Sequence, residues 1–184
     1  ANGEGILAEF SSPRAITRDA QGNFYITNTG KNIINKMTSG GTVTTIAGDG
    51  IGGYADGVGT SAIFSFPTGI IFDQQQNLII ADLANARIRK LVPTSAGNGA
   101  VDFLAGNGTA AQLTPSSIIM DDKSNLYVAD GTKYILKMTS TGDVSIFAGN
   151  GLQAFADGLN DISSFNIPQG ITITKGGDLI VSDT

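Results

Sequence analysis

The sequence predicts an all-β protein built of repeated four-stranded antiparallel sheets, and three observations support this prediction. Glycine, at 25 of 184 residues, has about twice its usual share, whereas charged residues make up only 15%. Short apolar runs typical of β-strands recur at a constant offset after a proline. The spacing of those prolines is close to fifty residues, as expected of a repeat architecture: Pro13, Pro67, Pro115 and Pro168.

Each repeat is expected to contain two β-hairpins. In the first repeat, runs 14–19 and 23–28 are separated by Ala-Gln-Gly, and runs 33–37 and 42–47 by Ser-Gly-Gly, which are turn signals. The same four runs return in the later repeats, at 68–73, 77–82, 87–92, 100–105, 116–121, 125–130, 134–138, 143–148, 169–174 and 178–183. The predicted units are therefore about 1–54, 55–105, 106–155 and an incomplete 156–184, within a single domain.

The inner strands of each repeat indicate how the sheets are arranged. Runs 69–72 and 78–81 are apolar on both faces, so each sheet must be covered on both sides. The outer run 43–46 instead alternates polar and apolar residues, as an edge near solvent should. Four-stranded sheets stacked face to face around an axis are the blades of a β-propeller. The sequence therefore predicts a β-propeller segment of about three and a half blades.

The second repeat, Ala55–Lys90, carries a motif that resembles the NHL repeat of bacterial-type β-propeller proteins: A-D-G-x-G-x-x-A-x-F-x-x-P-x-G-I-x-x-D-x-x-x-N-L-x-x-A-D-x-x-N-x-R-I-R-K. The other repeats match it with departures, such as Thr174 in place of Asp73 and Asn28 in place of Asp82. The resemblance implies a propeller that closes with about six blades. Two hypotheses follow: the chain is a segment of a longer propeller, or its open edges are completed by further copies of itself.

Composition excludes several classes of function. The net charge of −5 argues against a nucleic-acid partner, and no apolar run reaches the ~18 residues needed for membrane insertion. The absence of histidine and cysteine excludes Ser-His-Asp and Cys-His catalysis and the usual zinc sites. The prediction is therefore a protein that is not an enzyme, with no catalytic residue, metal or cofactor. A calcium-dependent hydrolase resembling propeller lactonases is kept as an alternative.

Aspartates recur at two positions of the repeat. Asp19, Asp73 and Asp121 begin short turns and are expected to cap the backbone there, rather than to bind a cation. Asp82, Asp130 and Asp183 end the second strand, and the loops that follow them share a face with the long loops between blades. The resemblance implies that ligands bind on that face.

The candidate binding surface consists of polar residues from the loops between the second and third strands: Asn28, Asn32, Asp82, Asn85, Arg87, Asp130 and Lys133. Arg87 and Arg89 are expected to be charges at the rim of their blade. The predicted function is an extracellular or cell-surface scaffold of a bacterium that binds a protein or a glycan, because low charge, many small polar residues and no cysteine suit that setting. The alternative is a self-associating structural subunit of a homopolymeric assembly or fibre, which needs only complementary ends.

Overall fold

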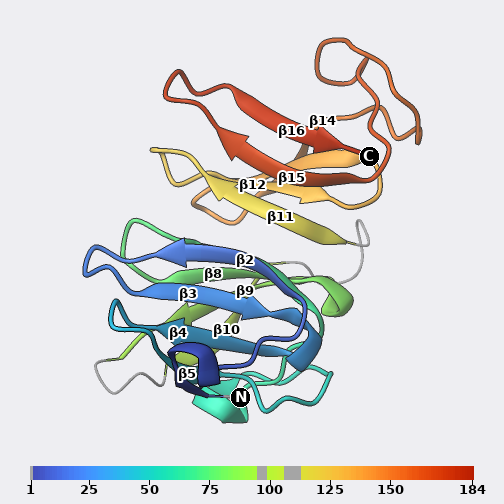
Figure 1. Cartoon of the computed structure of the whole chain (residues 1–184). Coiled ribbons are helices and arrows are strands. Elements are labelled where there is room, and N and C mark those ends of the chain that lie inside the picture. Colours follow the sequence, from blue (N-terminus) through green and yellow to red (C-terminus); the bar gives the residue numbers. More distant parts are fainter. Residues whose placement is uncertain (1, 95–98, 106–112) are drawn as a thin grey trace. The chain divides into compact units, whose positions relative to one another are not determined.

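The structure is a computed structural model that describes residues 2–94, 99–105 and 113–184. It divides into two compact units, Ala1–Gly106 and Asn107–Thr184, which we describe separately. Each unit consists of antiparallel sheets joined by loops (Figure 1).

The first unit contains two five-stranded sheets. The first sheet has the order β1-β5-β4-β3-β2, with β1 (Gly3–Glu4), β2 (Pro13–Arg18), β3 (Phe24–Asn28), β4 (Ile33–Met37) and β5 (Thr42–Ala47). The second has the order β6-β10-β9-β8-β7, with β6 (Gly57–Val58), β7 (Pro67–Phe72), β8 (Leu78–Asp82), β9 (Arg87–Val92) and β10 (Ala100–Ala105). Single 3-10 turns follow β1, β3, β6 and β8, namely η1 (Gly5–Leu7), η2 (Thr29–Lys31), η3 (Gly59–Ser61) and η4 (Leu83–Asn85).

The second unit contains one complete blade and one hairpin. The complete blade has the order β11-β12-β13-β14, with β11 (Pro115–Met120), β12 (Leu126–Asp130), β13 (Tyr134–Met138) and β14 (Val144–Ala148). The hairpin pairs β15 (Pro168–Ile173) with β16 (Leu179–Asp183).

The predicted fold class is confirmed, and the predicted strands agree with the observed ones to within about one residue at each end. The sequence did not predict a fifth strand in the first two sheets. Gly3 pairs with Val43, and Gly57 pairs with Val101, so the start of each inter-blade segment adds a short strand to the outer edge of its blade. The glycine of the Ala-Asp-Gly segment, Gly57, therefore begins a strand of the sheet.

The core of the first unit lies between its two sheets. Tyr25 and Ile34 of the first sheet form one buried cluster with Ile70 and Leu78 of the second, and Phe64 of the inter-blade loop is 0% exposed within it. This packing covers one face of each sheet's apolar inner strands. In the second unit, Tyr127, Ala129, Ile135 and Ile171 form the corresponding cluster.

The turn inside each first hairpin is held by its aspartate. Asp73 Oδ1 accepts hydrogen bonds from the backbone N–H groups of Gln75 and Asn77 at 2.9 and 2.8 Å, and Oδ2 accepts one from Asn77 Nδ2 at 2.8 Å. Asp19 with Asn23, and Asp121 with Asn125, repeat the bonds between aspartate and asparagine. These aspartates cap the turns, as expected of Asx turns.

The same bonds make part of the stability depend on pH. The pKa of Asp19 and that of Asp121 lie below the ordinary value of 3.8: partial burial acts to raise each pKa, but hydrogen bonds from Asn23 or Asn125 and from neighbouring donors outweigh it. A carboxyl group whose folded-state pKa is lowered stabilises the fold above its unfolded-state pKa. That contribution is lost as the pH falls through the folded-state pKa.

We therefore expect the urea concentration at the unfolding midpoint, measured by circular dichroism, to decrease as the pH is lowered from about 7 to about 3. Asp19→Asn combined with Asp121→Asn keeps an acceptor oxygen in each turn but removes the titrating group. The double variant should lose less of its midpoint over this range than the natural chain. Equal losses in both proteins would show that these two turns do not contribute to the acid sensitivity.

Candidate functional site

One contact recurs at the end of every second strand that the structure describes. The side-chain Oδ1 of the last residue of that strand accepts a hydrogen bond from a backbone N–H of the loop that leads into the same blade. The four pairs have distances of 2.7 to 2.8 Å: Asn28 with Ser11, Asp82 with Ser65, Asp130 with Thr114, and Asp183 with Asn166. The contact fixes the entering loop against the strand.

Three of the predicted binding residues belong to this set and are buried. Asn28, Asp82 and Asp130 are 1%, 0% and 2% exposed. Their side chains therefore hold the loops in place, and they are not part of the surface that a partner would contact.

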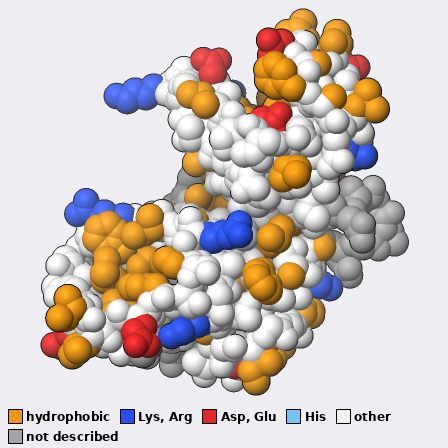
Figure 2. All heavy atoms as spheres, turned by 45° about the vertical axis from the view of Figure 1, so that its right-hand side comes forward, with side chains coloured by type: hydrophobic (Ala, Val, Ile, Leu, Met, Phe, Trp, Pro, Cys, Tyr) orange, Lys and Arg blue, Asp and Glu red, His pale blue; other side chains and the backbone are white. Residues whose placement is uncertain are grey.

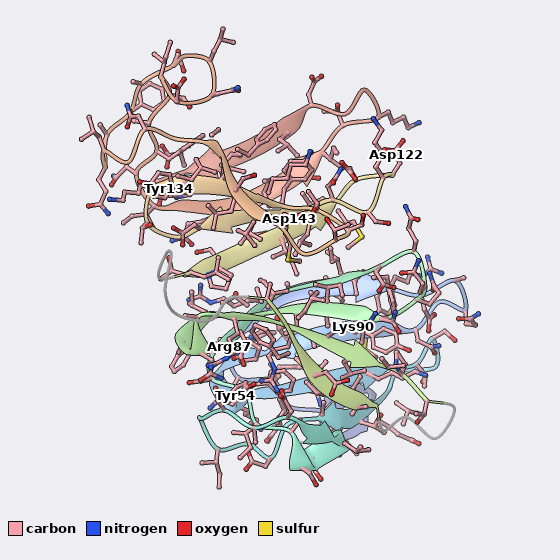
Figure 3. All side chains as sticks on the ribbon, turned by 180° about the vertical axis from the view of Figure 1, so that it is seen from behind. Tyr54, Arg87, Lys90, Asp122, Tyr134 and Asp143 are labelled. Carbon is pink, nitrogen blue, oxygen red and sulfur yellow. The ribbon has the colours of Figure 1, made fainter. Side chains whose placement is uncertain are left out.

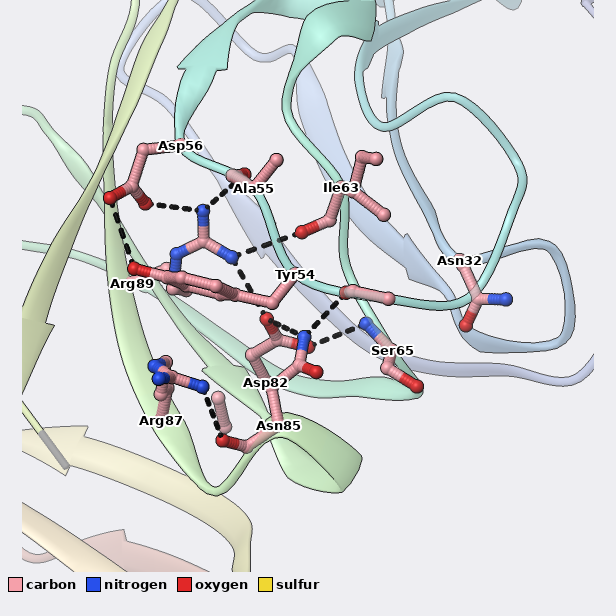
Figure 4. Close-up of polar contacts among 12 residues, drawn as sticks. Asn32, Tyr54, Ala55, Asp56, Ile63, Ser65, Asp82, Asn85, Arg87 and Arg89 are labelled. Atoms are coloured by element: carbon pink, nitrogen blue, oxygen red, sulfur yellow. Dashed lines mark hydrogen bonds and ion pairs between the residues drawn. The ribbon is translucent and has the colours of Figure 1, made fainter. Parts of the chain in front are cut away.

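The second blade contains a buried arginine, Arg89, at the centre of a polar network (Figure 4). The correction to the sequence analysis is that Arg89 is 0% exposed and not a rim charge. Its Nη1 donates to Asp82 Oδ2 at 3.0 Å and to the carbonyl of Ile63 at 3.1 Å. Its Nη2 donates to Asp56 Oδ1 at 2.7 Å and to the carbonyl of Ala55 at 2.8 Å. The guanidinium thus joins β8 and β9 to the inter-blade loop through four acceptors.

Two aromatic rings lie against this guanidinium. The Tyr54 ring centroid lies 4.7 Å from Arg89 Cζ and 3.8 Å from Arg87 Cζ, and the Phe64 ring centroid lies 5.1 Å from Arg89 Cζ. The Tyr54 hydroxyl donates to Asp56 Oδ2 at 3.0 Å. Burial raises the pKa of Tyr54, and the hydrogen bond to Asp56 adds to the shift. Burial also raises the pKa of Asp82, against the opposing hydrogen bonds from Asn85, Ser65 and Arg89.

The first blade has a neutral version of this network. Asn2, Asn28 and Asn35 occupy the repeat positions of Asp56, Asp82 and Arg89. They are connected by hydrogen bonds from Asn28 Nδ2 to Asn35 Oδ1 at 2.9 Å, from Asn35 Nδ2 to Thr45 Oγ1 at 3.3 Å, and from Thr45 Oγ1 to Asn2 Oδ1 at 2.9 Å. All three charged residues of the second blade are therefore neutral together in the first.

The third blade uses another solution. Leu136 occupies the repeat position of Arg89, and the carboxylate of Asp130 accepts hydrogen bonds from the hydroxyls of Thr114 and Thr132. Two hydroxyls thus replace the guanidinium as donors to the buried carboxylate.

The remaining predicted site residues are only half buried. Asn32, in a left-handed conformation with φ of 51°, accepts the N–H of Phe66 at 2.8 Å. Asn85 donates to the carbonyl of Gly53 at 2.7 Å and to Asp82 Oδ2 at 2.8 Å. Arg87 donates to the carbonyl of Asn85 at 3.1 Å. The first unit therefore brings Asn32, Asp82, Asn85 and Arg87 together around the inter-blade loop.

Asp130 and Lys133 belong to the second unit. Lys133 Nζ lies 5.6 Å from the centroid of the Tyr134 ring.

The loop end of the second blade exposes apolar side chains that the sequence analysis did not select. Tyr54, Phe66 and Ile51 are 41%, 53% and 69% exposed. Figure 3 shows Tyr54 and Arg87 close together, and Figure 2 shows hydrophobic side chains at the surface. A cavity of about 440 Å³ adjoins the same loop, lined in part by Lys31, Asp49 and Gly50.

Two searches of the described residues were negative. Within residues 2–94, 99–105 and 113–184, no three acidic, histidine or cysteine side chains are grouped so that they could hold a metal ion. No helix in this part of the chain is long and apolar enough to cross a membrane.

Comparison with known proteins gives partial matches in sequence. No protein-family model matches the chain. It is 32% identical over 110 residues to NHL repeat-containing protein 2 of Bos taurus, a match that covers 52% of this chain and 15% of that protein. It is 29% identical over 92 residues to SUPPRESSOR OF QUENCHING 1, chloroplastic, of Arabidopsis thaliana, covering 46% of this chain and 9% of that protein. The chain thus spans a small part of these curated relatives.

Solved structures match the fold over almost the whole chain. A putative gluconolactonase is similar with a TM-score of 0.71 at 14% identity, covering 97% of this chain and 58% of that one. Virginiamycin B lyase from Staphylococcus aureus has a TM-score of 0.57 at 17% identity, covering 94% and 56%. An auxiliary nutrient binding protein from Bacteroides thetaiotaomicron has a TM-score of 0.66 at 15% identity, covering 91% and 44%. The class of protein defined by the fold is therefore the β-propeller.

These matches correct the prediction that the protein is not an enzyme. Lyases and gluconolactonases are among the proteins that share the fold, so the inference from composition to a non-catalytic protein was wrong. The reasoning excluded only those mechanisms that need histidine or cysteine, and a propeller can present other side chains. The NHL resemblance is supported at the coarser level of a weakly similar NHL repeat-containing relative and propeller neighbours.

The two versions of the buried network lead to a test. Arg89→Asn leaves the carboxylate of Asp82 buried without its cation, and we expect a loss of about 3–5 kcal/mol in the free energy of unfolding. The triple variant Asp56→Asn, Asp82→Asn and Arg89→Asn introduces the three asparagines of the first blade and removes all three charges, and it should be clearly more stable than Arg89→Asn alone. Urea unfolding followed by circular dichroism measures both. A triple variant no more stable than the single one would show that the uncompensated charge is not the cause.

Proposed function

We propose that the chain supplies blades to an NHL-type β-propeller that acts at a bacterial cell surface or outside the cell, as a scaffold that binds a protein or a glycan. The binding surface is the loop end of the blades, where the loops after the second strands meet the inter-blade loops. Its partners at the open ends are further blades or copies of the same chain.

The observation that carries the proposal is the set of exposed side chains around Arg87. Tyr54 and Phe66 expose their rings at the loop end of the second blade, and Arg87 lies half buried against the face of Tyr54. Tyrosine, phenylalanine and arginine are enriched at protein interfaces, and tyrosine and arginine are the more frequent binding hot spots. A flat ring beside a polar donor also suits the alternating apolar faces and hydroxyls of a sugar.

These side chains are held in place before any ligand arrives. The bonds from Asn85 to Gly53 and from the Phe66 N–H to Asn32 tie the inter-blade loop to loops on both sides of it. A preorganised loop loses less conformational entropy when it binds a partner. The nutrient-binding neighbours of the same fold are consistent with such a role.

The test is a binding screen with matched variants. We expect the labelled chain to bind a subset of spots on an array of glycans and extracellular bacterial proteins, and Arg87→Ala and Phe66→Ala each to weaken that binding about tenfold or more. There are two control variants. Arg18→Ala changes the last residue of β2, at the end of that strand away from the inter-blade loop, and Phe103→Ala changes an exposed phenylalanine of β10. No binding, or equal losses in all four variants, would contradict the proposed surface.

A second candidate is a calcium-dependent hydrolase. The observation that favours it is the TM-score of 0.71 with a putative gluconolactonase. A metal-dependent hydrolase needs several oxygen ligands around one ion, and the described residues offer no group of three such side chains. The site would therefore have to include backbone carbonyls or residues other than those described.

This candidate predicts saturable calcium binding. Titration of the metal-free chain with calcium chloride in a calorimeter should give a binding isotherm, and the bound form should unfold at a higher temperature because binding stabilises the folded state. Magnesium chloride at the same ionic strength is the control. Heats of dilution alone, with an unchanged unfolding temperature, would remove this candidate and leave the binding scaffold unaffected.

A further inference from the structure

A row of alternating guanidinium and aromatic groups lies along the loop end of β9. Arg87 and Arg89 are two residues apart on this strand, so their side chains lie on the same face, with Cα atoms about 7 Å apart. The Tyr54 ring fills the space between them, with its centroid 3.8 Å from Arg87 Cζ and 4.7 Å from Arg89 Cζ (Figure 4). Each face of the Tyr54 ring is therefore covered by one guanidinium group.

The row is buried at one end and reaches the surface at the other. At the inner end, Arg89 is 0% exposed, and its Cζ also lies 5.1 Å from the ring centroid of the buried Phe64. At the outer end, Arg87 is half buried and is the first residue of β9. Arg89 thus has two ring neighbours, whereas Arg87 has one within the described part of the chain. The face of the Arg87 guanidinium that points away from Tyr54 is therefore the outer end of the row.

The structure holds the outer guanidinium in this orientation. Arg87 Nη1 donates to the carbonyl of Asn85 at 3.1 Å, and Arg87 Nε is buried, without an acceptor among the described residues. The Tyr54 ring beneath it is fixed in turn, because its hydroxyl donates to Asp56 Oδ2 at 3.0 Å. A planar group that is already held in place loses little conformational freedom when another ring stacks on it.

The fold of the repeat does not require an arginine at the outer position. The residues that pair in the same register as Arg87 and Arg89 are neutral in the other complete blades: Ile33 and Asn35 in the first, Tyr134 and Leu136 in the third. The first blade nevertheless forms the same 3-10 turn before this position, ending in a left-handed residue, with φ of 51° at Asn32 and 53° at Ala86. Arg87 is therefore a feature of one blade, as recognition of a particular partner needs.

The order of the row indicates the chemistry of a partner. The face of a guanidinium group attracts the face of an aromatic ring. A sugar instead stacks on the face of an aromatic ring, and both faces of Tyr54 are already covered. The net charge of −5 argues against the bases of a nucleic acid. The group that fits the outer end of the row is therefore an aromatic side chain of a protein, and tryptophan and tyrosine are the aromatic residues most frequent among binding hot spots.

We propose that Arg87 binds a tryptophan or tyrosine side chain of a protein partner, stacked on the face of the guanidinium that points away from Tyr54. This inference rests on the proposed function and narrows its partner from a protein or a glycan to a protein. The partner's ring becomes the next member of the row. Phe66, which is 53% exposed, adjoins the turn that precedes Arg87, since its carbonyl accepts the N–H of Leu83 at 3.3 Å. It offers apolar surface to the residues around the partner's ring.

The probe is N-acetyl-L-tryptophanamide, a neutral molecule that carries the side chain of one tryptophan residue. We expect its titration into the isotope-labelled chain to move the NMR signal of the Arg87 Nε–H upfield and saturably, because an aromatic ring shields protons that lie over its face. N-acetyl-L-leucinamide, which is apolar but has no ring, and methyl β-D-glucopyranoside should leave this signal in place. The Nε–H signal of Arg18, whose Cζ lies 5.7 Å from the Phe24 ring centroid, is the internal control and should not move.

Variants of the chain separate stacking on Arg87 from general attraction. Arg87→Ile introduces the residue of the first blade at this position, and Arg87→Lys keeps the charge but loses the planar group. Both should weaken binding of the tryptophanamide about threefold or more, measured from the backbone signals of residues 83–86. Arg18→Ile removes an arginine beside another ring and should leave the affinity unchanged. Circular dichroism checks that the variants are folded.

Two results would overturn the proposal: an Arg87 signal that does not move saturably with the tryptophanamide, and equal affinities of the natural chain and Arg87→Ile for it. Both can be told apart from a failure of the proposed function. If binding to the array depends on Arg87 but the titration fails, the surface is retained and the aromatic partner is rejected. If the titration succeeds and the array shows no binding, the aromatic site is supported and the scaffold function is contradicted.

Discussion

The structure depends on one recurring hydrogen bond between the end of the second strand of a blade and the loop that enters that blade. Asp82 in the second blade and Asn28 in the first make this bond from almost fully buried side chains. A buried backbone N–H without a partner would cost a large part of a hydrogen bond, so the loop has a strong preference for this one position. This bond therefore ties each long loop between blades, which contains exposed residues, to the end of a strand.

Burying an aspartate for this purpose creates a second constraint, because its other oxygen and its charge also need partners. The second blade meets this need with Arg89, the third with the hydroxyls of Thr114 and Thr132, and the first avoids the charge by using Asn28. Neutral Asn2 and Asn35 accompany Asn28, whereas charged Asp56 and Arg89 accompany Asp82. A change at one residue of the network is therefore accompanied by a change in the partners of the others.

The fold could be predicted almost completely from the sequence, because the proline spacing, the turn residues and the doubly apolar inner strands are local signals that repeat. The fifth strand was missed because Gly3-Glu4 and Gly57-Val58 are too short to give a strand pattern. The burial of Arg89 was also missed. The alternation along β9 shows on which face of the sheet a side chain lies, but it does not show whether that side chain is buried. A comparison of the repeats at positions 2, 28 and 35 with 56, 82 and 89 could have indicated it, because the three differences occur together.

The recurring aspartates illustrate how a repeat protein can mislead a search for a binding site. Asp82, Asp130 and Asp183, with Asn28 in the first blade, recur because each of these strands has the same kind of loop to hold. Recognition of a particular partner needs residues that differ between blades and reach the solvent. Tyr54 and Phe66 meet both conditions, since Phe155 occupies the position of Tyr54 in the second unit and Ser12 occupies that of Phe66 in the first blade. The recurring polar residues thus hold the loops, and the side chains that vary on those loops are where specificity can be encoded.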